Sequence, residues 1–327
     1  MRILITGGLG FIGTNLINYL VKKDKIKQII IIDNQSKSST KYLDGIRSYK
    51  YFNNIKSYRL NKSRINVVNA DVKNSTFANK ITKNIDCVIH LAAESGVDLS
   101  IKNPRKSFDI NINGTFNYLD ACRINNVKNF IFASSGSVFG DAKPPMSEMT
   151  LKNPISTYGS SKLCIETFCE TYSKVFEINT TILRFSNAYG PYSLHKKSIV
   201  ANYSKNIIDG RPISINGDGK TTRDYIHVSD IVKAIYNSLK QKDSHQNFNI
   251  STGKQTSINT LLKKIINIFS KFGYKKIIIK HQKERRGDMR FNSMSSKKYL
   301  KHYKENKFIN VNDGLRNTIE WFIQNYK

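Results

Sequence analysis

The first half of the chain alternates between short apolar runs and longer stretches of helical periodicity. The apolar runs are rich in isoleucine and valine, as is typical of strands buried on both faces of a sheet. They lie at residues 3–6, 29–32, 67–72, 87–93 and 130–134. From Pro104 to Asn125, apolar side chains recur at helical spacing. Strands alternating with helices to about residue 190 predict an α/β fold with a doubly wound parallel sheet.

The second half is less regular and predicts a smaller C-terminal α/β lobe. Helices are expected at residues 198–209, 229–240, 257–270 and 314–326, and strands at residues 212–216, 248–250 and 276–280. No proline- or serine-rich linker divides the chain. We therefore expect one domain over residues 1–190 and a second over residues 191–327, with some chain crossing between the lobes around residues 224–250.

A glycine-rich turn follows the first apolar run directly. Gly8, Gly10 and Gly13 have the spacing G-x-G-x-x-G, and Gly7 gives the wider spacing G-x-x-G-x-x-G with the last two. Glycines at these positions allow a tight turn, close approach of a pyrophosphate to the backbone, and close packing of helix on strand. The helix that begins at about Phe11 would direct its free N–H groups and positive dipole end at the phosphates.

An acidic residue stands where such a site needs one. The second apolar run ends in Asp33, twenty residues after Gly13, where a carboxylate accepts both hydroxyls of an adenosine ribose. Its charge disfavours a 2′-phosphate, so NAD is preferred over NADP. A plain turn with a solvated aspartate is the alternative, but strand, glycines, helix and acid stand in the order of a Rossmann dinucleotide site.

Charge is the unusual feature of the composition. The 327 residues include 53 Lys+Arg and 24 Asp+Glu, which gives a formal net charge of +29. The lysines are spread over the whole length in runs no longer than doublets such as Lys22-Lys23, whereas nucleic-acid proteins usually concentrate their charge in one element or domain. Most of the excess is interpreted as solvated surface, and a diffuse positive field would help to steer an anionic substrate or cofactor.

The remaining composition excludes several classes. The four cysteines form no C-x-x-C pair and are expected to be reduced; they are Cys87, Cys122, Cys164 and Cys169. The six histidines lack ligand spacing, so no metal is expected. There is no signal-peptide pattern and no apolar stretch of membrane-spanning length. The sequence predicts a cytoplasmic protein that contacts neither membrane nor nucleic acid.

Two candidate chemical groups lie four residues apart in a predicted helix. Tyr158 and Lys162 would share one helix face. A nearby ammonium favours the phenolate, which would lower the pKa of the tyrosine and make it a general base. Y-x-x-x-K is weak as a bare pattern, since most such pairs are surface side chains. Ser135 follows a predicted strand at the sheet edge where ligands bind. His90, in another strand, is expected to be a satisfied buried histidine.

These motifs, taken in order, resemble the extended short-chain dehydrogenase/reductase family. The stretches around Ile215–Asp230 and Arg285–Asp288 resemble specifically its NAD-dependent nucleotide-sugar epimerase/dehydratase branch, and most closely the UDP-glucose and UDP-N-acetylglucosamine 4-epimerases. The matching stretches are Thr6–Gly13, Asp33-Asn34, Asp71-Val72, His90–Ala93, Ser134–Gly140, Tyr158–Lys162, Arg184–Pro191, Ile215–Asp230 and Arg285–Asp288.

The resemblance implies a role for each matching residue. Ser135, Tyr158 and Lys162 are the implied catalytic residues. The implied NAD contacts are Gly7, Gly10, Phe11, Ile12, Asp33, Asn34, Asp71, Val72, Leu91, Ala92, Ala93, Tyr158 and Lys162. The implied contacts of the nucleotide-diphosphate sugar are Ser135, Ser137, Tyr158, Asn187, Arg223, Arg285 and Asn292. A homodimer is also implied, with the helices of residues 104–125 and 158–176 at its interface.

The choice of reaction depends on two positions. Dehydratases of this family usually carry Asp-Glu where this chain has Gly136 and Ser137. Sugar-nucleotide decarboxylases usually carry Glu at the position of Ser137. Epimerisation at C4, with transient oxidation, rotation of the 4-keto intermediate and return of the hydride, is therefore favoured. The alternatives are a 4-ketoreductase or dehydratase-like enzyme of the same family, and a non-catalytic dinucleotide-binding protein that associates with nucleic acid.

The sugar is the least determined part of the substrate. By resemblance, Asn292 occupies a position that borders the sugar C2 substituent, where a tyrosine would narrow the pocket. The smaller asparagine leads to the hypothesis that a 2-acetamido sugar such as UDP-GlcNAc fits as well as UDP-glucose. Two residues of this segment depart from the family pattern, because Arg286 replaces a proline and Ser295 replaces an aspartate.

Overall fold

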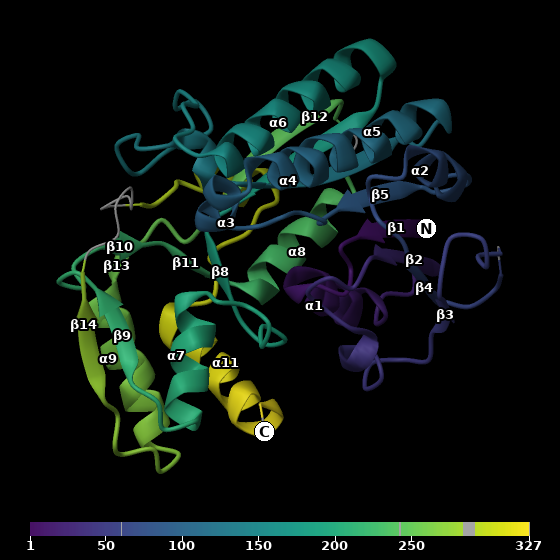
Figure 1. Ribbon diagram of the computed structural model, residues 1–327. Coiled ribbons are helices and arrows are strands. Elements are labelled where there is room, and N and C mark those ends of the chain that lie inside the picture. The colour runs from purple at the N-terminus through teal and green to yellow at the C-terminus, as the bar shows by residue number, and fades with distance from the viewer. Residues whose placement is uncertain (60, 242, 284–291, 327) are drawn as a thin grey trace. The chain divides into compact units, whose positions relative to one another are not determined.

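The computed structural model describes residues 1–59, 61–241, 243–283 and 292–326 (Figure 1). The chain forms two compact units. The first comprises Met1–Asp141, Thr150–Arg184 and Val232–Phe248, and the second comprises Ala142–Met149, Phe185–Ile231 and Asn249–Lys327. Each unit is therefore built from several separate segments of the chain.

An eight-stranded sheet forms the centre of the first unit. Its order is β12-β7-β6-β5-β1-β2-β4-β3, and the pairings from β6 across to β3 are parallel. The strands are β1 Arg2–Thr6, β2 Gln28–Asp33, β3 Lys50–Phe52, β4 Ile65–Asn69, β5 Cys87–His90, β6 Asn129–Ser135, β7 Asn179–Phe185 and β12 His245–Ile250. The chain turns to opposite sides of β1, with β2 on one side and β5 on the other, which confirms the predicted doubly wound sheet. Ligands of such sheets bind beyond the carboxyl ends of the strands at this switch point.

Helices connect the strands of the first unit and cover the sheet (Figure 1). They are α1 Phe11–Leu20, α2 Ser75–Ile81, α3 Val97–Lys102, α4 Pro104–Phe108, α5 Gly114–Ile124, α6 Thr157–Phe176 and α8 Val228–Ser238. Short 3-10 turns occur at Thr40–Tyr42 and Gly136–Phe139. α1 lies next to α8, since the rings of Tyr19 and Tyr236 pack edge to face at 5.3 Å.

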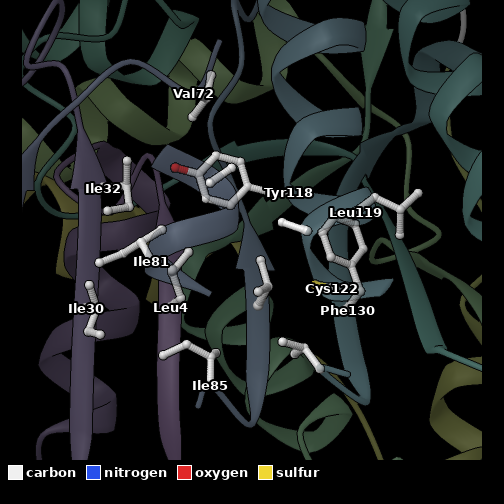
Figure 2. Close-up of a cluster of buried hydrophobic side chains, with 14 of the residues drawn as sticks. Leu4, Ile30, Ile32, Val72, Ile81, Ile85, Tyr118, Leu119, Cys122 and Phe130 are labelled. Atoms are coloured by element: carbon white, nitrogen blue, oxygen red, sulfur yellow. The ribbon is translucent and has the colours of Figure 1, made fainter. Parts of the chain in front are cut away.

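The core of the first unit lies between the sheet and the helices α2, α5 and α6. Figure 2 shows strand residues such as Leu4 and Ile30 together with Tyr118, Leu119 and Cys122 of α5. These side chains are at most 1% exposed. Burying a side chain of this size stabilises a fold by about 1.5–3 kcal/mol. This packing fixes the carboxyl ends of the strands, where the predicted site residues lie.

The predicted helix from Pro104 to Asn125 is interrupted. Its central turn, Asp109–Asn113, is a π-helical turn between α4 and α5. The Asn111 side chain accepts a hydrogen bond from the Glu94 main-chain N–H (2.8 Å) and donates to the Glu94 carbonyl (3.2 Å). A π turn inserts one residue into a helix and redirects its side chains. Periodicity alone did not reveal this break, because apolar residues continue on both sides of it.

The second unit contains short two-stranded sheets packed with helices. Its core side chains come chiefly from α7, α9, α11 and β9. The elements are β8 Asn187–Tyr189, α7 Ile199–Ile208, β9 Ile213–Asn216, β10 Thr222–Arg223, β11 Tyr225–His227, β13 Thr256–Ser257, α9 Ile258–Ser270, β14 Ile279–Gln282, α10 Lys297–His302 and α11 Val311–Asn325. Ser257 is the N-cap of α9, since its hydroxyl accepts a hydrogen bond from the Thr260 N–H (3.1 Å).

Two local predictions differ from the structure. The segment Tyr42 to Arg64 lies outside the apolar runs that predicted strands, yet it contains the edge strand β3. The strand expected at residues 276–280 lies instead at Ile279–Gln282. Both strands are short and polar at the edge of a sheet, where pairing rather than hydrophobic pattern decides the structure. Within the described ranges, no helix combines the length and apolar character needed to cross a membrane.

Candidate active site

The glycine turn connects β1 to α1 and fits a pyrophosphate. Gly7 has φ +66°, and a Cβ there would lie 2.7 Å from the Ala92 backbone at the end of β5. A Cβ at Gly13 would lie 2.4 Å from the Gly8 carbonyl oxygen. Gly10 is the N-cap of α1 and provides no side-chain cap, and the first turn contains no acidic residue. The first N–H groups of α1, which include those of Phe11 and Ile12, therefore have no side-chain acceptor and suit an anionic group.

Asp33 lies at the carboxyl end of β2 and contacts the glycine turn. Its carboxylate accepts hydrogen bonds from the N–H of Leu9 (3.1 Å), the N–H of Gln35 (2.8 Å) and the hydroxyl of Ser38 (3.3 Å). Burial raises the pKa of Asp33, and these three hydrogen bonds oppose the shift. Because an ionised carboxylate has about four acceptor positions, Asp33 retains acceptor capacity for a ribose hydroxyl.

The loops after β2, β4 and β5 meet through polar side chains. The Asn34 amide donates to Asp71 at 3.4 Å. The buried carboxylate of Glu94 forms ion pairs with Lys37, in the loop after β2, and with Lys106 of α4. Burial would raise the pKa of Glu94, but the two ammonium groups lower it below its ordinary value. Glu94 was not predicted as a site residue, although it directly follows the small residues that end β5.

The end of β5 is held against β1. The Leu91 N–H donates to the Thr6 carbonyl (3.1 Å), and the Ala92 N–H donates to the Thr6 hydroxyl (3.3 Å). His90 is fully buried, with one ring nitrogen 3.0 Å from the Thr6 hydroxyl and the other 3.0 Å from that of Thr115. Burial lowers the pKa of His90 to about 3. It is therefore a neutral, satisfied strand histidine, as expected. Ala93 continues the segment and has only a methyl side chain.

The loop after β4, which carries Asp71 and Val72, is held against α5. Val72 follows β4, and its carbonyl accepts a hydrogen bond from the Asn117 amide of α5 at 3.1 Å. A Cβ at Gly114 would lie 2.7 Å from a Val72 methyl group. Glycine at this position therefore allows α5 to approach the loop that carries Asp71 and Val72.

Ser135 and Tyr158 come together at the carboxyl end of β6. Ser135 lies close enough to Tyr158 to lower the pKa of the phenol, and the Ser135 hydroxyl donates to the hydroxyl of Ser137 at 3.1 Å. Tyr158 lies in the first turn of α6, where Ser156 is the N-cap. A Cβ at Gly159 would lie 2.4 Å from the Ser137 carbonyl oxygen. Glycine at this position lets the start of α6 approach the turn that carries Ser135 and Ser137.

Lys162 lies one helical turn after Tyr158 and is 2% exposed. Its ammonium donates to the Ala133 carbonyl at 2.8 Å and lies 5.8 Å from the centroid of the Tyr158 ring. Burial lowers the pKa of Lys162 to about 7, against an opposing effect of Glu166. An ammonium has three donors, so the bond to Ala133 leaves two for other partners.

The pKa of Tyr158 differs from the prediction. Burial raises it above its ordinary value of 10, while the hydrogen bond with Ser135 lowers it in part. The expected lowering by Lys162 is therefore not found in the chain by itself. Lys162, with a pKa of about 7, is already neutral in the higher pH range where the phenol titrates, so it supplies no charge there that would favour the phenolate.

A buried ion pair lies behind these residues. The Glu166 carboxylate accepts hydrogen bonds from the Arg184 guanidinium of β7 at 2.9 and 2.7 Å and from the Ser134 hydroxyl of β6 at 2.5 Å. Both charged side chains are at most 4% exposed. The ion pair between Glu166 and Arg184 was not predicted from the sequence. The available signal was the position of Glu166, which is one turn after Lys162 on the same helix face.

The second unit contains two other predicted substrate residues close together. The N–H and side-chain amide of Asn187, on β8, both donate to the Asp224 carbonyl, at 3.0 and 3.3 Å. Arg223, on β10, precedes Asp224 and donates to the Thr222 carbonyl at 2.7 Å. Asp224 is fully buried and accepts hydrogen bonds from the loop that follows β12, including the Gly253 N–H at 2.8 Å. Asp224 thus fixes the backbone between Asn187 and Arg223.

The last two predicted substrate residues are Arg285 and Asn292. Arg285 lies outside the described residues, as does Arg286. Asn292 is described and is 7% exposed. The adjacent Ser293 carbonyl accepts a hydrogen bond from the Met146 N–H at 3.0 Å, which attaches this segment to the residues 142–149 of the same unit.

A doubly wound sheet with a glycine turn, an acid after β2 and a Ser-Tyr-Lys set defines a dinucleotide-dependent enzyme of the short-chain dehydrogenase type. Comparison with known proteins narrows the class. The pattern of the family described as NAD dependent epimerase/dehydratase matches residues 3–251. Because this match covers more than half of the chain, the protein belongs to that family, and NAD is its cofactor. The resemblance to the nucleotide-sugar epimerase/dehydratase branch is confirmed.

Individual relatives include both epimerases and dehydratases. UDP-glucose 4-epimerase from Thermotoga maritima, solved with UDP-glucose, is 28% identical with a TM-score of 0.88, and 100% of both chains is covered. UDP-N-acetylglucosamine 4-epimerase from Methanobrevibacter ruminantium M1, solved with UDP-N-acetylmuramic acid, is 26% identical with a TM-score of 0.85, covering 99% of this chain and 98% of that one. Human dTDP-D-glucose 4,6-dehydratase is 28% identical over 99% of this chain and 91% of its own.

Replacement of Gly7 by alanine should remove the cofactor. The new Cβ would meet the Ala92 backbone at 2.7 Å at a residue with φ +66°, so the turn must move away from the pyrophosphate position. We expect the NAD content of the purified Gly7→Ala protein, measured after denaturation, to fall by about tenfold or more. Gly45→Ala is the control, because nothing lies within 4 Å of a Cβ at Gly45. Equal NAD content in both variants would contradict this role of the turn.

The pKa of Lys162 predicts a pH dependence of stability. Its pKa is about 7 in the folded chain, against an ordinary value of 10.5, so the unfolded state binds more protons between these values. The contribution of Lys162 to the free energy of unfolding should therefore rise with pH from 7 to 10, by at most about 1.4 kcal/mol per unit. Denaturant unfolding of the NAD-free protein and of Lys162→Met, compared across this range, measures the difference. The exposed Lys263→Met is the control, and a difference for Lys162→Met that stays constant with pH would refute the assignment.

Proposed function

We propose that the protein is an NAD-dependent 4-epimerase of a nucleotide sugar. The observation that carries this proposal is the gathering of Ser135, Tyr158 and Lys162 at the carboxyl end of β6, with the Lys162 ammonium 5.8 Å from the centroid of the Tyr158 ring and bonded to the Ala133 carbonyl. NAD, which the residues around the glycine turn would hold, would supply the acceptor and later the donor of the hydride at the sugar C4. The protein residues bind the reactants and move the proton that accompanies each hydride transfer.

Tyr158 takes the proton from the sugar 4-hydroxyl in this mechanism. Ser135, which lies beside the phenol, donates a hydrogen bond to the same sugar oxygen and holds it within reach. Lys162 supplies its two remaining donors to the cofactor ribose. When the 4-keto sugar has rotated, hydride would return to the opposite face of C4 while Tyr158 gives the proton back to the C4 oxygen. The new C4–H bond inverts the configuration without net oxidation or reduction.

Epimerisation is favoured over dehydration because of residues 136 and 137. Elimination of water from a sugar needs an acid and a base near C5 and C6, but this chain has Gly136 and Ser137 there. The Ser137 hydroxyl has a pKa far too high for either role and is engaged by Ser135. Dehydratases also occur among the relatives, so a dehydratase-like or 4-ketoreductase activity is the alternative function. The same assays test it. A one-way reductase would consume reduced cofactor, whereas an epimerase would not.

The cofactor and the substrate nucleotide are assigned to different residues. NAD is held by the residues around the glycine turn, with Asp33 on the adenosine ribose and Asp71 with Val72 near the adenine. The substrate diphosphate and ribose are assigned to Asn187, Arg223 and Arg285, because a guanidinium binds phosphate oxygens with two parallel hydrogen bonds. The solved UDP-sugar complexes of the two epimerases named above support a uridine nucleotide.

The sugar is proposed to be glucose, galactose or their 2-acetamido forms. Asn292 is assigned to the border of the sugar C2 substituent, where its small side chain leaves room for an acetamido group. The similarity to a UDP-N-acetylglucosamine 4-epimerase is in keeping with this assignment.

A cytoplasmic homodimer is proposed as the working form. Helices α4, α5 and α6 carry apolar side chains that are unusually exposed, including Phe108 (45%), Ile124 (47%) and Phe176 (42%). Apolar patches of this kind often mark interfaces between proteins. The predicted interface helices of residues 104–125 and 158–176 carry all three.

The reaction is tested by incubating the purified protein with UDP-GlcNAc and with UDP-glucose without added cofactor. We expect C4 epimers to form from at least one substrate, because NAD stays bound through the cycle. Absence of both epimers, together with oxidation of added NADPH by a 4-keto sugar, would establish the reductase instead. Absence of any turnover, with binding of a random RNA that persists at physiological salt, would establish the non-catalytic alternative.

Replacement of Tyr158 by phenylalanine tests the base. The variant keeps the aromatic ring but loses the proton acceptor, so turnover should fall by about 10²–10⁴-fold, while the NAD content stays unchanged. Tyr326→Phe, at a tyrosine far along the chain in the second unit, should retain full activity. Activity of Tyr158→Phe close to that of the unmodified protein would exclude Tyr158 as the base.

A further inference from the structure

A hollow in the surface of the first unit is lined by basic side chains. Its volume is about 600 Å³, within the range of small-ligand sites. The lining residues are Arg2, Lys56, Tyr58, Arg59, Lys80, Ile81, Lys83 and Asn84. Five of these eight side chains are cationic and none is acidic, so the hollow is a concentrated patch of positive charge, which we call the basic pocket.

The basic pocket lies at the amino ends of the strands. Arg2 begins β1, and Asn84 precedes β5, so both stand at the strand ends opposite the glycine turn and Asp33. Lys80 and Ile81 end α2, and Arg59 lies in the connection from β3 to β4. The site for NAD is at the carboxyl ends of the same strands. The basic pocket is therefore separate from the residues assigned to cofactor and catalysis.

The positive charges of the basic pocket are not neutralised by neighbouring carboxylates. Among the described residues, none of its five cations forms an ion pair. Arg2 donates through Nε to the Gln28 amide oxygen (3.0 Å), and Arg59 donates to the Lys56 and Tyr58 carbonyls. The carboxylate of Asp86 accepts from the Arg2 main-chain N–H (2.7 Å) and is not part of the lining. Cations gathered without counter-charges repel one another, and a bound anion removes that repulsion.

The wall of the basic pocket also offers apolar surface. Ile81 is 2% exposed and belongs to the core cluster shown in Figure 2. The Tyr58 ring is 7% exposed and packs edge to face on Phe52 at 5.1 Å. Burial raises the pKa of Tyr58, and Arg2 opposes the shift, which indicates that the guanidinium lies close to this phenol. An aromatic ring beside cations suits a ligand with both a flat apolar part and a charged part.

We propose that the basic pocket binds a small phosphate-bearing molecule, with Lys80, Lys83 and their basic neighbours holding the phosphates and Tyr58 with Ile81 contacting an aromatic base. The chemical class is a nucleoside diphosphate or a close analogue. A nucleic acid is the competing partner, but it requires charge arranged along an extended track, whereas here the charge surrounds a single hollow. This proposal is independent of the proposed epimerase function.

The test is calorimetric titration of the full-length, NAD-saturated protein at about 0.15 M salt with pyrophosphate and with ADP. For each probe we expect a binding event at the basic pocket, distinct from any at the residues assigned to the sugar nucleotide, and tighter binding of ADP because its base contacts Tyr58. The double variant Lys80→Gln/Lys83→Gln should weaken both probes by about tenfold, since each lysine contributes a charge-assisted contact. Both lysines are exposed, so the substitutions leave the core intact.

Two matched variants identify the site. Lys275→Gln/Lys276→Gln also removes two positive charges, but from lysines outside the basic pocket, and should leave the binding event unchanged. Arg223→Gln, in the residues assigned to the sugar nucleotide, should also leave it unchanged. Loss of binding in Arg223→Gln but not in Lys80→Gln/Lys83→Gln would overturn the proposal, as would the absence of binding. Binding of a random RNA that is tighter than that of ADP and lost in Lys80→Gln/Lys83→Gln would overturn it in favour of a nucleic-acid surface. Failure of the epimerase assay alters none of these outcomes.

Discussion

The buried carboxylate of Glu166 holds together the part of the first unit that carries the chemistry. It accepts hydrogen bonds from Arg184 of β7 and Ser134 of β6, and it lies on α6 one turn beyond Lys162. A buried ion pair is retained only when its hydrogen bonds are satisfied, and removal of one partner leaves an uncompensated charge that costs about 3–5 kcal/mol. The position of α6 on the sheet, and with it the placement of Tyr158 against Ser135, depends on this pair.

Local patterns revealed the elements, and motif order revealed the site. Strands such as β1 and β5 were predictable because they are buried on both faces, and the glycine turn because backbone geometry demands those glycines. The Ser135, Tyr158 and Lys162 set required the resemblance, since the spacing of two residues specifies little. The ion pairs of Glu166 and Glu94 were not predictable in the same way, because their partners Arg184, Lys37 and Lys106 are distant in the sequence. Such pairings follow from the fold and not from any local pattern.

Electrostatics was the least predictable part. The sequence places a lysine four residues after a tyrosine and thereby suggests a lowered phenol pKa, yet burial acts on both groups and raises the pKa of Tyr158 while lowering that of Lys162. Similarly, the total charge of +29 suggested a diffuse surface, whereas the fold gathers Arg2, Lys80 and their neighbours from separate segments into one hollow. The sequence gives the number of charged residues, but only the fold determines which of them lie together on the surface.

The π-helical turn at Asp109–Asn113 has a consequence beyond helix geometry. By turning Asn111 inward, it lets one amide donate both to the Glu94 carbonyl (3.2 Å) and to the Ser161 hydroxyl (3.1 Å), which in turn donates to the Tyr158 carbonyl (2.8 Å). Glu94 is paired with Lys37 in the loop after β2. These polar contacts connect the loop after β2 to the first turn of α6, which carries Tyr158. The connection depends on the single residue that the π turn inserts into the helix.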